Sequence, residues 1–297
     1  MRLAARHPSI GFLSLLLLLA FGCSPARSPG AAAPRIGIVN KGSDTMVNLA
    51  LAWAEAYQQV EPEVDVSVTG GGSGTGIAAL INGTVDLANA SRRIKPEEVE
   101  EARANGVDPV EIVVARDAIA VIVHPANPVD HLTIAQISDI YSGAINNWAE
   151  VGGVDRPIVR LSRETNSGTH VYFLEEVLRQ GQPDNQTLFA ADTLLLPSSE
   201  GIAAEIAYNE NAIGYDGLGY VTEAMKVIAV GHDPTAPYSL PSAETVNNGE
   251  YPIARDLYMY SPGQPSPSAQ AYLAWILGPA GQTLVAELGF VPLRPTP

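Results

Sequence analysis

The chain has 297 residues, of which 46% are apolar and 16% are charged, and its formal net charge at pH 7 is −15. The apolar fraction is ample for a packed core and excludes a disordered chain. The acidic charge argues against a nucleic-acid binder that works through a basic surface. The single cysteine cannot form an internal disulfide or a cysteine-rich zinc site. The histidines are scattered, with no two at the spacing of metal ligands on one helix, so we expect no metal site.

The N-terminal segment is typical of an export signal. Arg2 and Arg6 precede an almost wholly apolar run over residues 12–21, which is shorter than the ~20 residues that span a bilayer. Small residues then lead to Cys23, which resembles the end of a bacterial lipoprotein signal. We therefore predict that residues 1–22 are removed and that Cys23 becomes a lipidated, membrane-anchored N-terminus. The alternatives are an ordinary signal peptide with a chance cysteine, and a transmembrane anchor.

Residues 23–35 are small and proline-rich, without apolar periodicity, which predicts a flexible tether. No later segment reaches 18 consecutive apolar residues, so we expect a soluble body outside the cytoplasm. Strands are expected at 36–40, 64–68, 85–88, 110–114, 118–123, 157–161, 212–215 and 253–260. Helices are expected at 42–60, 77–82, 96–105, 134–141, 168–179, 201–209 and 266–277, the last clear one. This alternation predicts an α/β fold with a largely parallel sheet.

Three predicted helix starts carry hydroxyl side chains, at residues 43–45, 73–75 and 167–169. A helix N-terminus presents unpaired amides and a partial positive charge, glycine admits a ligand close to the backbone, and Ser or Thr adds a donor. Such a start is suited to an oxyanion. If the three starts converge, they surround one tetrahedral anion with donors. Taken singly, each start is better explained by ordinary N-capping.

Arginines follow two of the predicted strands. Arg163 lies four residues before Ser167 and could present a two-pronged donor to anion oxygens. A surface pair with Glu164 is the alternative. Arg92 and Arg93 follow the strand at 85–88, and either could serve a ligand or be solvated.

The sequence indicates no enzyme, and we predict no catalytic residue and no cofactor. The glycine-rich loops do not end in Gly-Lys-Ser/Thr, so there is no nucleotide P-loop. Ser73 lies in a GGSGT stretch that lacks the second glycine of a hydrolase nucleophile elbow. His170 follows Thr169 directly, but neighbours on a helix point in different directions, so we interpret it as a packing or surface residue. A secreted serine hydrolase or phosphatase remains the alternative from another class.

Several stretches together resemble the phosphate-binding lipoproteins of bacterial ABC transporters. The matching stretches are GSDTM at 42–46, GGGSGTGIAAL at 70–80, VDLANASR at 85–92, DAIAVIVHPANPV at 117–129, IYSGAINNW ending at 148, SRETNSGT at 162–169, AIGYDGLGY at 212–220 and YPIARDLYMY at 251–260. They keep their order and span about residues 36–295. The combination is specific, whereas no single glycine-rich piece would be.

The resemblance implies a type II periplasmic-binding-protein fold, in which two α/β lobes are joined by two crossing strands and close over a ligand in the cleft between them. The crossings are expected near residues 117–123 and 251–260. One lobe would then be discontinuous, formed by 36–117 and 254–297, and the other would be 118–253.

The resemblance also implies a set of anion donors: Ser43, Thr45, Ser73, Ser91, Arg163, Ser167, Gly168 and Thr169. One departure concerns the ligand's proton. Longer-chain relatives place an aspartate directly after the Ala-Ser that matches Ala90-Ser91, whereas this chain has Arg92. The acid must come from elsewhere, and we predict Asp44. A favourable charge in a helix's first turn is the alternative role for that residue.

The function implied is the capture of inorganic phosphate outside the cytoplasmic membrane and its delivery to the permease subunits of an ABC transporter, by a monomer that does no chemistry on its ligand. The nearest rival is a binding protein for another tetrahedral oxyanion, such as sulfate, molybdate or tungstate. A phosphate sensor or surface adhesin on the same fold is a further alternative.

Overall fold

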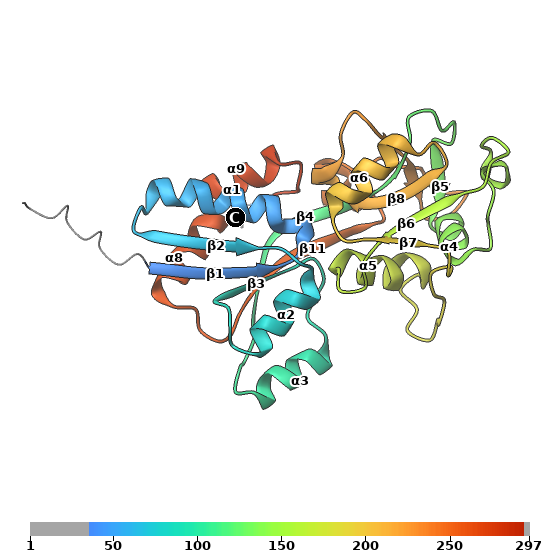
Figure 1. Cartoon of the computed structure of the whole chain (residues 1–297). Helices are drawn as coiled ribbons and strands as arrows, with labels where there is room; N and C mark the ends of the chain where they lie inside the picture. The colour runs from blue at the N-terminus through green and yellow to red at the C-terminus, as the bar shows by residue number, and fades with distance from the viewer. Residues whose placement is uncertain (1–35, 294–297) are drawn as a thin grey trace, which may run out of the picture. The chain divides into compact units, whose positions relative to one another are not determined.

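A computed structural model of the protein describes residues 36–293 (Figure 1). The predicted signal peptide, the tether and Cys23 lie outside these residues. The strands are β1 (Ile36–Gly42), β2 (Val64–Thr69), β3 (Leu87–Ala90), β4 (Val110–Val123), β5 (His131–Thr133), β6 (Val159–Arg163), β7 (Leu194–Leu196), β8 (Ala212–Gly217), β9 (Lys226–Val227), β10 (Ala229–Gly231) and β11 (Ala254–Ser261).

One mixed sheet runs through the described residues in the order β2-β1-β3-β11-β4-β8-β6-β7, with β9 paired to β4. Strands β2, β1 and β3 are parallel, and so are β8, β6 and β7. Between these groups, β11 and β4 run antiparallel to each other and to their outer neighbours (Figure 1). The prediction of a largely parallel sheet is therefore wrong at its centre. There the chain passes between two lobes on strands of opposite direction.

Strand β4 is continuous from Val110 to Val123, where the sequence predicted two strands. Two polar residues, Arg116 and Asp117, interrupt the apolar pattern. Arg116 pairs at the surface with Asp256, and Asp117 is buried against Arg255. Both polar side chains thus find partners on the neighbouring strand β11, and the strand continues through them.

The helices are η1 (Asp44–Met46), α1 (Val47–Val60), α2 (Ser73–Ile81), α3 (Pro96–Ala104), α4 (Ile134–Ser142), η2 (Trp148–Val151), α5 (Gly168–Tyr172), η3 (Phe173–Leu178), α6 (Ser199–Tyr208), η4 (Leu218–Tyr220), α7 (Ala243–Asn247), α8 (Pro267–Leu277) and α9 (Pro279–Glu287). Helix α2 begins four residues before the predicted start at 77, and the predicted helix 168–179 is α5 followed by one turn of π-helix. Helix α9 was not predicted. No helix within residues 36–293 has both the length and the apolar character needed to cross a bilayer.

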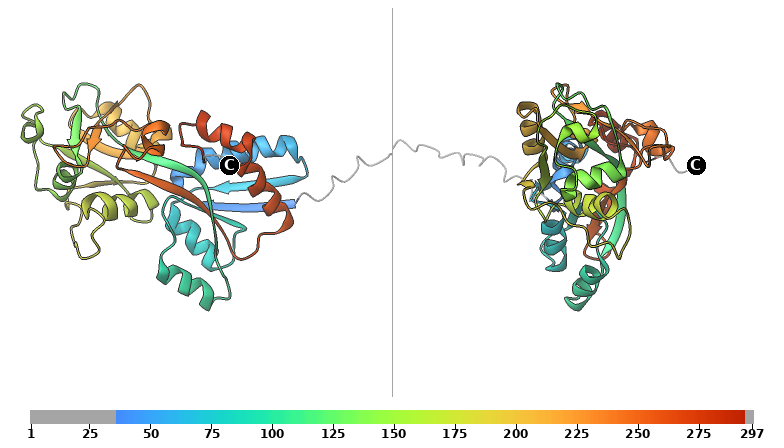
Figure 2. Two further views of the ribbon diagram at one scale, coloured as in Figure 1. Left: turned by 180° about the vertical axis from the view of Figure 1, so that it is seen from behind. Right: turned by 90° about the vertical axis from the view of Figure 1, so that its right-hand side faces the viewer.

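Each lobe has its own hydrophobic core. In the first lobe, α1, α8 and α9 share one cluster, while α2 and α3 pack in another with β3 (Figures 1 and 2). Trp53 of α1 is fully buried, and its Nε1 donates to the carbonyl oxygen of Gly281 at 2.8 Å. In the second lobe, the rings of Phe173 and Tyr215 stack with centroids 3.6 Å apart. Truncating a buried aromatic of this size to alanine costs about 3–5 kcal/mol, so these contacts stabilise each lobe.

Candidate anion-binding site

The predicted donors of the first lobe follow the ends of three parallel strands. Ser43 comes directly after β1, Ser73 is the first residue of α2 after β2, and Ser91 comes directly after β3. The carboxyl ends of parallel strands meet at one edge of a sheet, which is where open α/β sheets bind ligands. All three side chains are buried. Ser73 Oγ accepts from the Ser91 amide at 2.9 Å and lies 3.2 Å from Ser91 Oγ.

The predicted donors of the second lobe follow β6. Arg163 is the last residue of that strand, and Ser167 is the N-cap of α5, where its Oγ accepts from the Thr169 amide at 3.2 Å. Gly168 and Thr169 form the first turn of α5 and are buried. The predicted helix start at residues 167–169 is therefore confirmed, with Ser167 as its N-cap.

The two sets of donors meet between the lobes. Thr45 Oγ1 lies 2.7 Å from Thr169 Oγ1, and the amide of Gly74 donates to the carbonyl oxygen of Asn166 at 2.9 Å. Gly168 faces two hydroxyls of the other lobe so closely that a Cβ there would lie 2.3 Å from Ser73 Oγ. Only glycine fits at that position. All three hydroxyl-rich helix starts thus converge.

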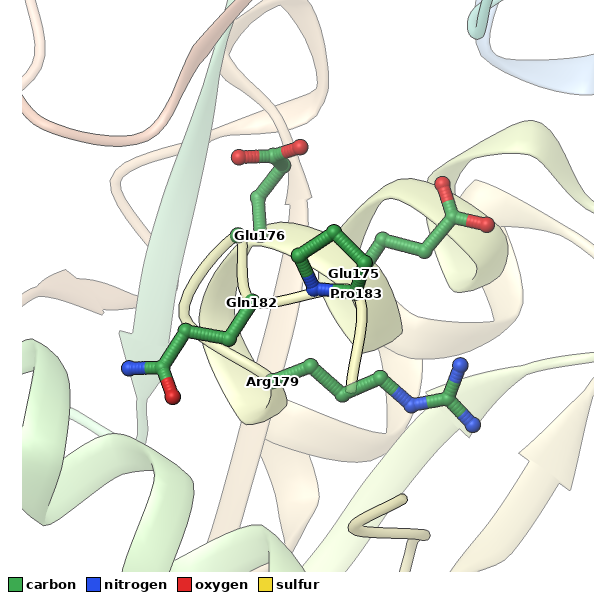
Figure 3. A pocket seen from close by; sticks show the side chains of 6 residues that line it. Glu175, Glu176, Arg179, Gln182 and Pro183 are labelled. Atoms are coloured by element: carbon green, nitrogen blue, oxygen red, sulfur yellow. The ribbon is translucent and has the colours of Figure 1, made fainter. Parts of the chain in front are cut away.

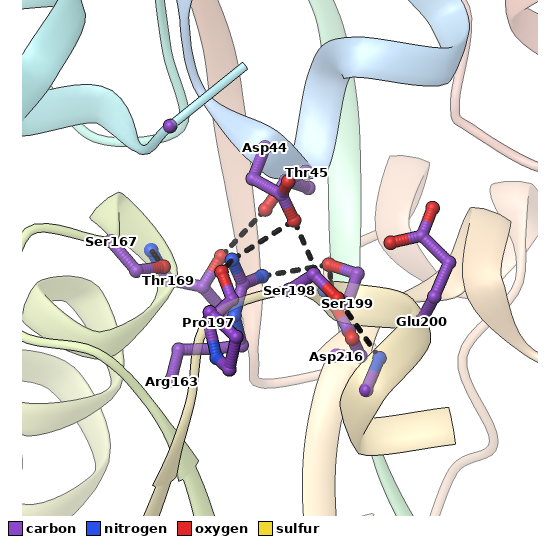
Figure 4. A network of polar contacts seen from close by, with 12 residues as sticks. Asp44, Thr45, Arg163, Ser167, Thr169, Pro197, Ser198, Ser199, Glu200 and Asp216 are labelled. Carbon is purple, nitrogen blue, oxygen red and sulfur yellow. Dashed lines mark hydrogen bonds and ion pairs between the residues drawn. The ribbon is translucent and has the colours of Figure 1, made fainter. Parts of the chain in front are cut away.

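Arg163 lies at the centre of a polar network that spans both lobes (Figure 4). Its side chain is 1% exposed. Nη2 donates to Asp44 Oδ2 at 2.9 Å and to the carbonyl oxygen of Pro197 at 2.9 Å, while Nη1 donates to Ser199 Oγ at 2.7 Å. Asp44 Oδ2 also accepts from the Ser199 amide at 3.0 Å. The alternative of a surface pair between Arg163 and Glu164 is wrong, because Arg163 is buried against Asp44 and Glu164 is exposed.

The two arginines that follow β3 have other partners. Arg92 makes a two-pronged ion pair with Glu98, at 2.8 and 2.6 Å, which ties the loop to α3. Arg93 is largely exposed and pairs with Glu111 at 2.9 Å. The guanidinium of Arg92 thus binds an acid of its own lobe.

Three buried polar residues at the site were missed by the sequence reasoning: Ser199, Asp216 and Arg255. Ser199 Oγ donates to Asp216 Oδ1 at 2.8 Å and so links that carboxyl to Arg163. Burial raises the pKa of Asp216 to about 7. A signal was available for Arg255, because it interrupts an apolar strand, as does its partner Asp117 on the other crossing strand. Nothing local marks Ser199 or Asp216.

Two buried donor atoms of the site, Ser43 Oγ and Arg163 Nε, have no hydrogen-bond partner among the described residues, and one buried acceptor, Asp216 Oδ2, has none either. Buried polar groups are nearly always paired, so these two donors indicate a ligand that brings acceptors. Some first-turn amides of α2 and α5 are already used, since that of Gly74 donates to the carbonyl oxygen of Asn166 and that of Thr169 donates to Ser167 Oγ. Within residues 36–293, no three His, Cys, Asp or Glu side chains are placed to hold a metal ion. The arrangement suits an oxyanion.

A serine–histidine pair lies next to the site but inside the core. Ser162 Oγ is 3.0 Å from His170 Nδ1 and 2.6 Å from the hydroxyl of Tyr215. Ser162 has no exposed surface, and His170 stacks on Phe189 with ring centroids 4.7 Å apart. Burial lowers the pKa of His170. A substrate cannot reach this serine, which agrees with the interpretation of His170 as a packing residue.

A surface hollow of about 330 Å³ lies over η3, away from the donors (Figure 3). It is lined by Glu175, Glu176, Arg179, Gly181, Gln182 and Pro183. It shares no residue with the predicted anion site, and its carboxylates do not suit an anion.

Comparison with known proteins places this site in a family. A model of the PBP superfamily domain matches residues 28–280. The phosphate-binding protein PstS of Pseudomonas aeruginosa is 32% identical over 269 residues, which cover 85% of this chain and 81% of that protein. A substrate-binding protein from Clostridium perfringens, solved with bound phosphate, superimposes with a TM-score of 0.78 at 31% identity and covers 87% of this chain and 100% of that one. An ABC-type phosphate transport receptor from Vibrio cholerae superimposes with a TM-score of 0.69 at 27% sequence identity, and the match covers 86% of this chain and 100% of that one. The chain therefore belongs to the PBP superfamily and, within it, to the family of the phosphate-binding protein PstS.

Proposed function

We propose that the protein binds inorganic phosphate between its two lobes, outside the cytoplasmic membrane, and delivers it to the permease of an ABC transporter. The observation that carries the proposal is the convergence of the three hydroxyl-bearing helix starts between the lobes, where Thr45 lies 2.7 Å from Thr169 and Gly168 faces the Ser73 hydroxyl. The relatives support it, since one is named a phosphate-binding protein and another was solved with phosphate bound. The protein does no chemistry on the ligand.

The donors can supply the necessary free energy. Micromolar binding requires about −8 kcal/mol, and charge-assisted hydrogen bonds contribute ~1.5–3 kcal/mol each. The whole chain carries a net charge of −15, which repels an anion at long range. Salt screens that repulsion within ~8 Å at physiological ionic strength. The guanidinium of Arg163 and the helix N-termini act at contact distance and therefore dominate.

We place the lobe boundaries where β4 and β11 cross, so that residues 36–117 and 254–297 form one lobe and 118–253 the other. Two observations support this division: the hydrophobic clusters separate close to these positions, and Ala118 pairs with Ala254 in the sheet. Closure would then be a rotation about the two crossing strands. The lipid anchor at Cys23 and the monomeric state belong to the same proposal.

Asp44 is the proposed acceptor for the proton of bound phosphate. Its Oδ2 is held by Arg163 and the Ser199 amide, while Oδ1 makes no hydrogen bond to any residue from 36 to 293. A carboxylate oxygen only accepts hydrogen bonds. Phosphate near neutral pH keeps at least one proton, whereas sulfate keeps none and would place two negative oxygens against each other. The other acids near the motifs are less suited, because Asp86 accepts from the Val39 amide and Glu164 is exposed.

The test is calorimetric titration with phosphate, arsenate, sulfate and molybdate, of the wild-type protein and of Asp44→Asn. We expect the wild type to prefer phosphate over sulfate by up to about 10⁴–10⁵, as in sites built around a hydrogen-bonding group of the ligand. Asp44→Asn should lose most of this preference, because an amide can also donate to sulfate. A wild-type protein that prefers sulfate or molybdate would identify the rival oxyanion function. A mutant that keeps the wild-type ratio would leave Asp44 as a first-turn charge only.

A further inference from the structure

Arg255 connects the crossing strands with the donors of the anion site. It lies on β11 directly opposite Asp117 on β4, and the two side chains are 2% and 0% exposed. Its Nε and Nη2 donate to Asp117 Oδ2 at 3.1 and 2.7 Å. Nη1 donates to the carbonyl oxygen of Ser91 in the first lobe at 2.9 Å, and Nη2 donates to Thr169 Oγ1 in the second lobe at 3.0 Å. One guanidinium therefore contacts both halves of the site.

The bond to Thr169 fixes the direction of that hydroxyl. A guanidinium carries donors and no acceptor, so Thr169 Oγ1 must accept from Arg255. The single hydroxyl proton of Thr169 is then left for a different acceptor. In this structure its other neighbour is Thr45 Oγ1, at 2.7 Å. An anion oxygen at the same place would receive that proton, and a hydroxyl that accepts from a cation is a stronger donor.

We propose that Arg255 is a positioning residue for anion binding, which holds the Thr169 hydroxyl as a donor toward the ligand. The proposal rests on the proposed function, because it assumes an anion between the lobes. The Asp117 carboxylate balances the charge of Arg255, so that the buried guanidinium orients Thr169 without leaving an unpaired charge in the core. Asp117 Oδ1 is itself held by the Leu218 amide at 3.2 Å, which fixes the pair in place.

A double-mutant cycle tests this. The full chain is titrated with phosphate as wild type, Arg255→Lys, Thr169→Val and the double variant. Each single change should raise the dissociation constant about 10–100-fold, the value of one hydrogen bond to a charged group. The double variant should bind phosphate at most about threefold more weakly than the single variant with the lower affinity. Both changes remove the hydrogen bond between Arg255 and Thr169, so their effects on the dissociation constant should not multiply. Losses that multiply in the double variant would overturn the proposal.

Arg160→Lys is the matched control, because Arg160 is also buried and ion-paired, with Asp192, but its other hydrogen bonds, such as those to the carbonyl oxygens of Ile140 and Ile145, go to no residue of the site. Arg160→Lys should lower the melting temperature and change the dissociation constant for phosphate less than about twofold. A loss of phosphate affinity equal to that of Arg255→Lys would overturn the proposal. If Arg255→Lys does not fold, Asp117→Asn retains the guanidinium and removes a negative charge. Because Asp117 also fixes Arg255, the effect of Asp117→Asn on the dissociation constant should disappear when Thr169 is already Val, and an effect of the same size in that background would overturn the proposal. A wild-type protein that does not bind phosphate would overturn the proposed function itself, which the same titration shows separately.

Discussion

Arg163→Ala should abolish most of the affinity for phosphate. The Arg163 side chain is 1% exposed and holds the carboxylate of Asp44, itself only 16% exposed. Truncating one member of a buried, hydrogen-bonded charge pair costs about 2–5 kcal/mol, which corresponds to a dissociation constant about 30- to 5,000-fold higher. We expect the upper part of this range, because the variant leaves the Asp44 carboxylate unpaired beside an anion and removes the unpartnered donor Nε.

Two control variants separate binding from folding. Arg93→Ala removes an arginine whose side chain is 67% exposed and which pairs with Glu111 at the surface, so it should cost at most about 1 kcal/mol, or fivefold. Arg160→Ala removes a buried arginine three residues earlier on the same strand, and should lower stability while leaving affinity unchanged. The assay is calorimetric titration, with urea unfolding of each variant. Equal, small effects of Arg163→Ala and Arg93→Ala would refute the assignment of Arg163 as the cation of the site.

Two other predictions concern the anchor and a buried carboxyl. Cys23→Ser should release the protein from the membrane or leave its signal uncleaved, because stable anchoring needs several acyl chains and Cys23 is the residue predicted to carry them. Unchanged membrane fractionation and signal processing would contradict the lipoprotein prediction. Burial raises the pKa of Asp216 from 3.8 to about 7, so the folded state binds more protons between these values. The free energy of unfolding, measured in urea without phosphate, should therefore fall as pH rises from about 4 to about 7, by up to about 4 kcal/mol. Asp216→Asn should flatten this slope, and a slope unchanged in the variant would argue against the raised pKa.

The sequence predicted the donors better than it predicted the network that holds them. Ser43, Ser73 and Ser167 lie where local patterns indicate that a strand ends and a helix begins, and such patterns span only a few residues. The partner of Arg163 is Asp44, 119 residues earlier. No periodic pattern in the sequence indicates that two side chains so far apart in the chain form an ion pair. The pairing depends on how the two lobes meet, which only the folded chain determines.

The differences between the predicted and the observed fold have similar physical causes. Helix α2 begins at Ser73. Ser, Gly and Thr favour turns when they are considered locally, so the sequence predicts a loop where the first turn of this helix lies. Strand β4 was divided because Arg116 and Asp117 are polar, yet each is paired on β11. The antiparallel centre of the sheet likewise follows from the crossing of the chain between lobes. Alternation of strands and helices indicates the layers but not the direction in which a crossing strand runs.

The hydrogen bonds within the site bear on where its affinity originates. Thr45 and Thr169 bond to each other, as do Ser73 and Ser91, and Arg163 already binds Asp44. A ligand that bonds to these hydroxyls exchanges one hydrogen bond for another, and such exchanges give only ~0.5–1.5 kcal/mol each. The larger gains must come from the donors that are buried and unpartnered, Ser43 Oγ and Arg163 Nε. An anion accepts hydrogen bonds from these unpartnered donors and places a negative charge beside Arg163. A neutral ligand of the same size would leave Asp44 alone to balance the charge of Arg163. We therefore attribute selectivity for an anion to the unpaired donors, and we propose that Asp44 selects among anions.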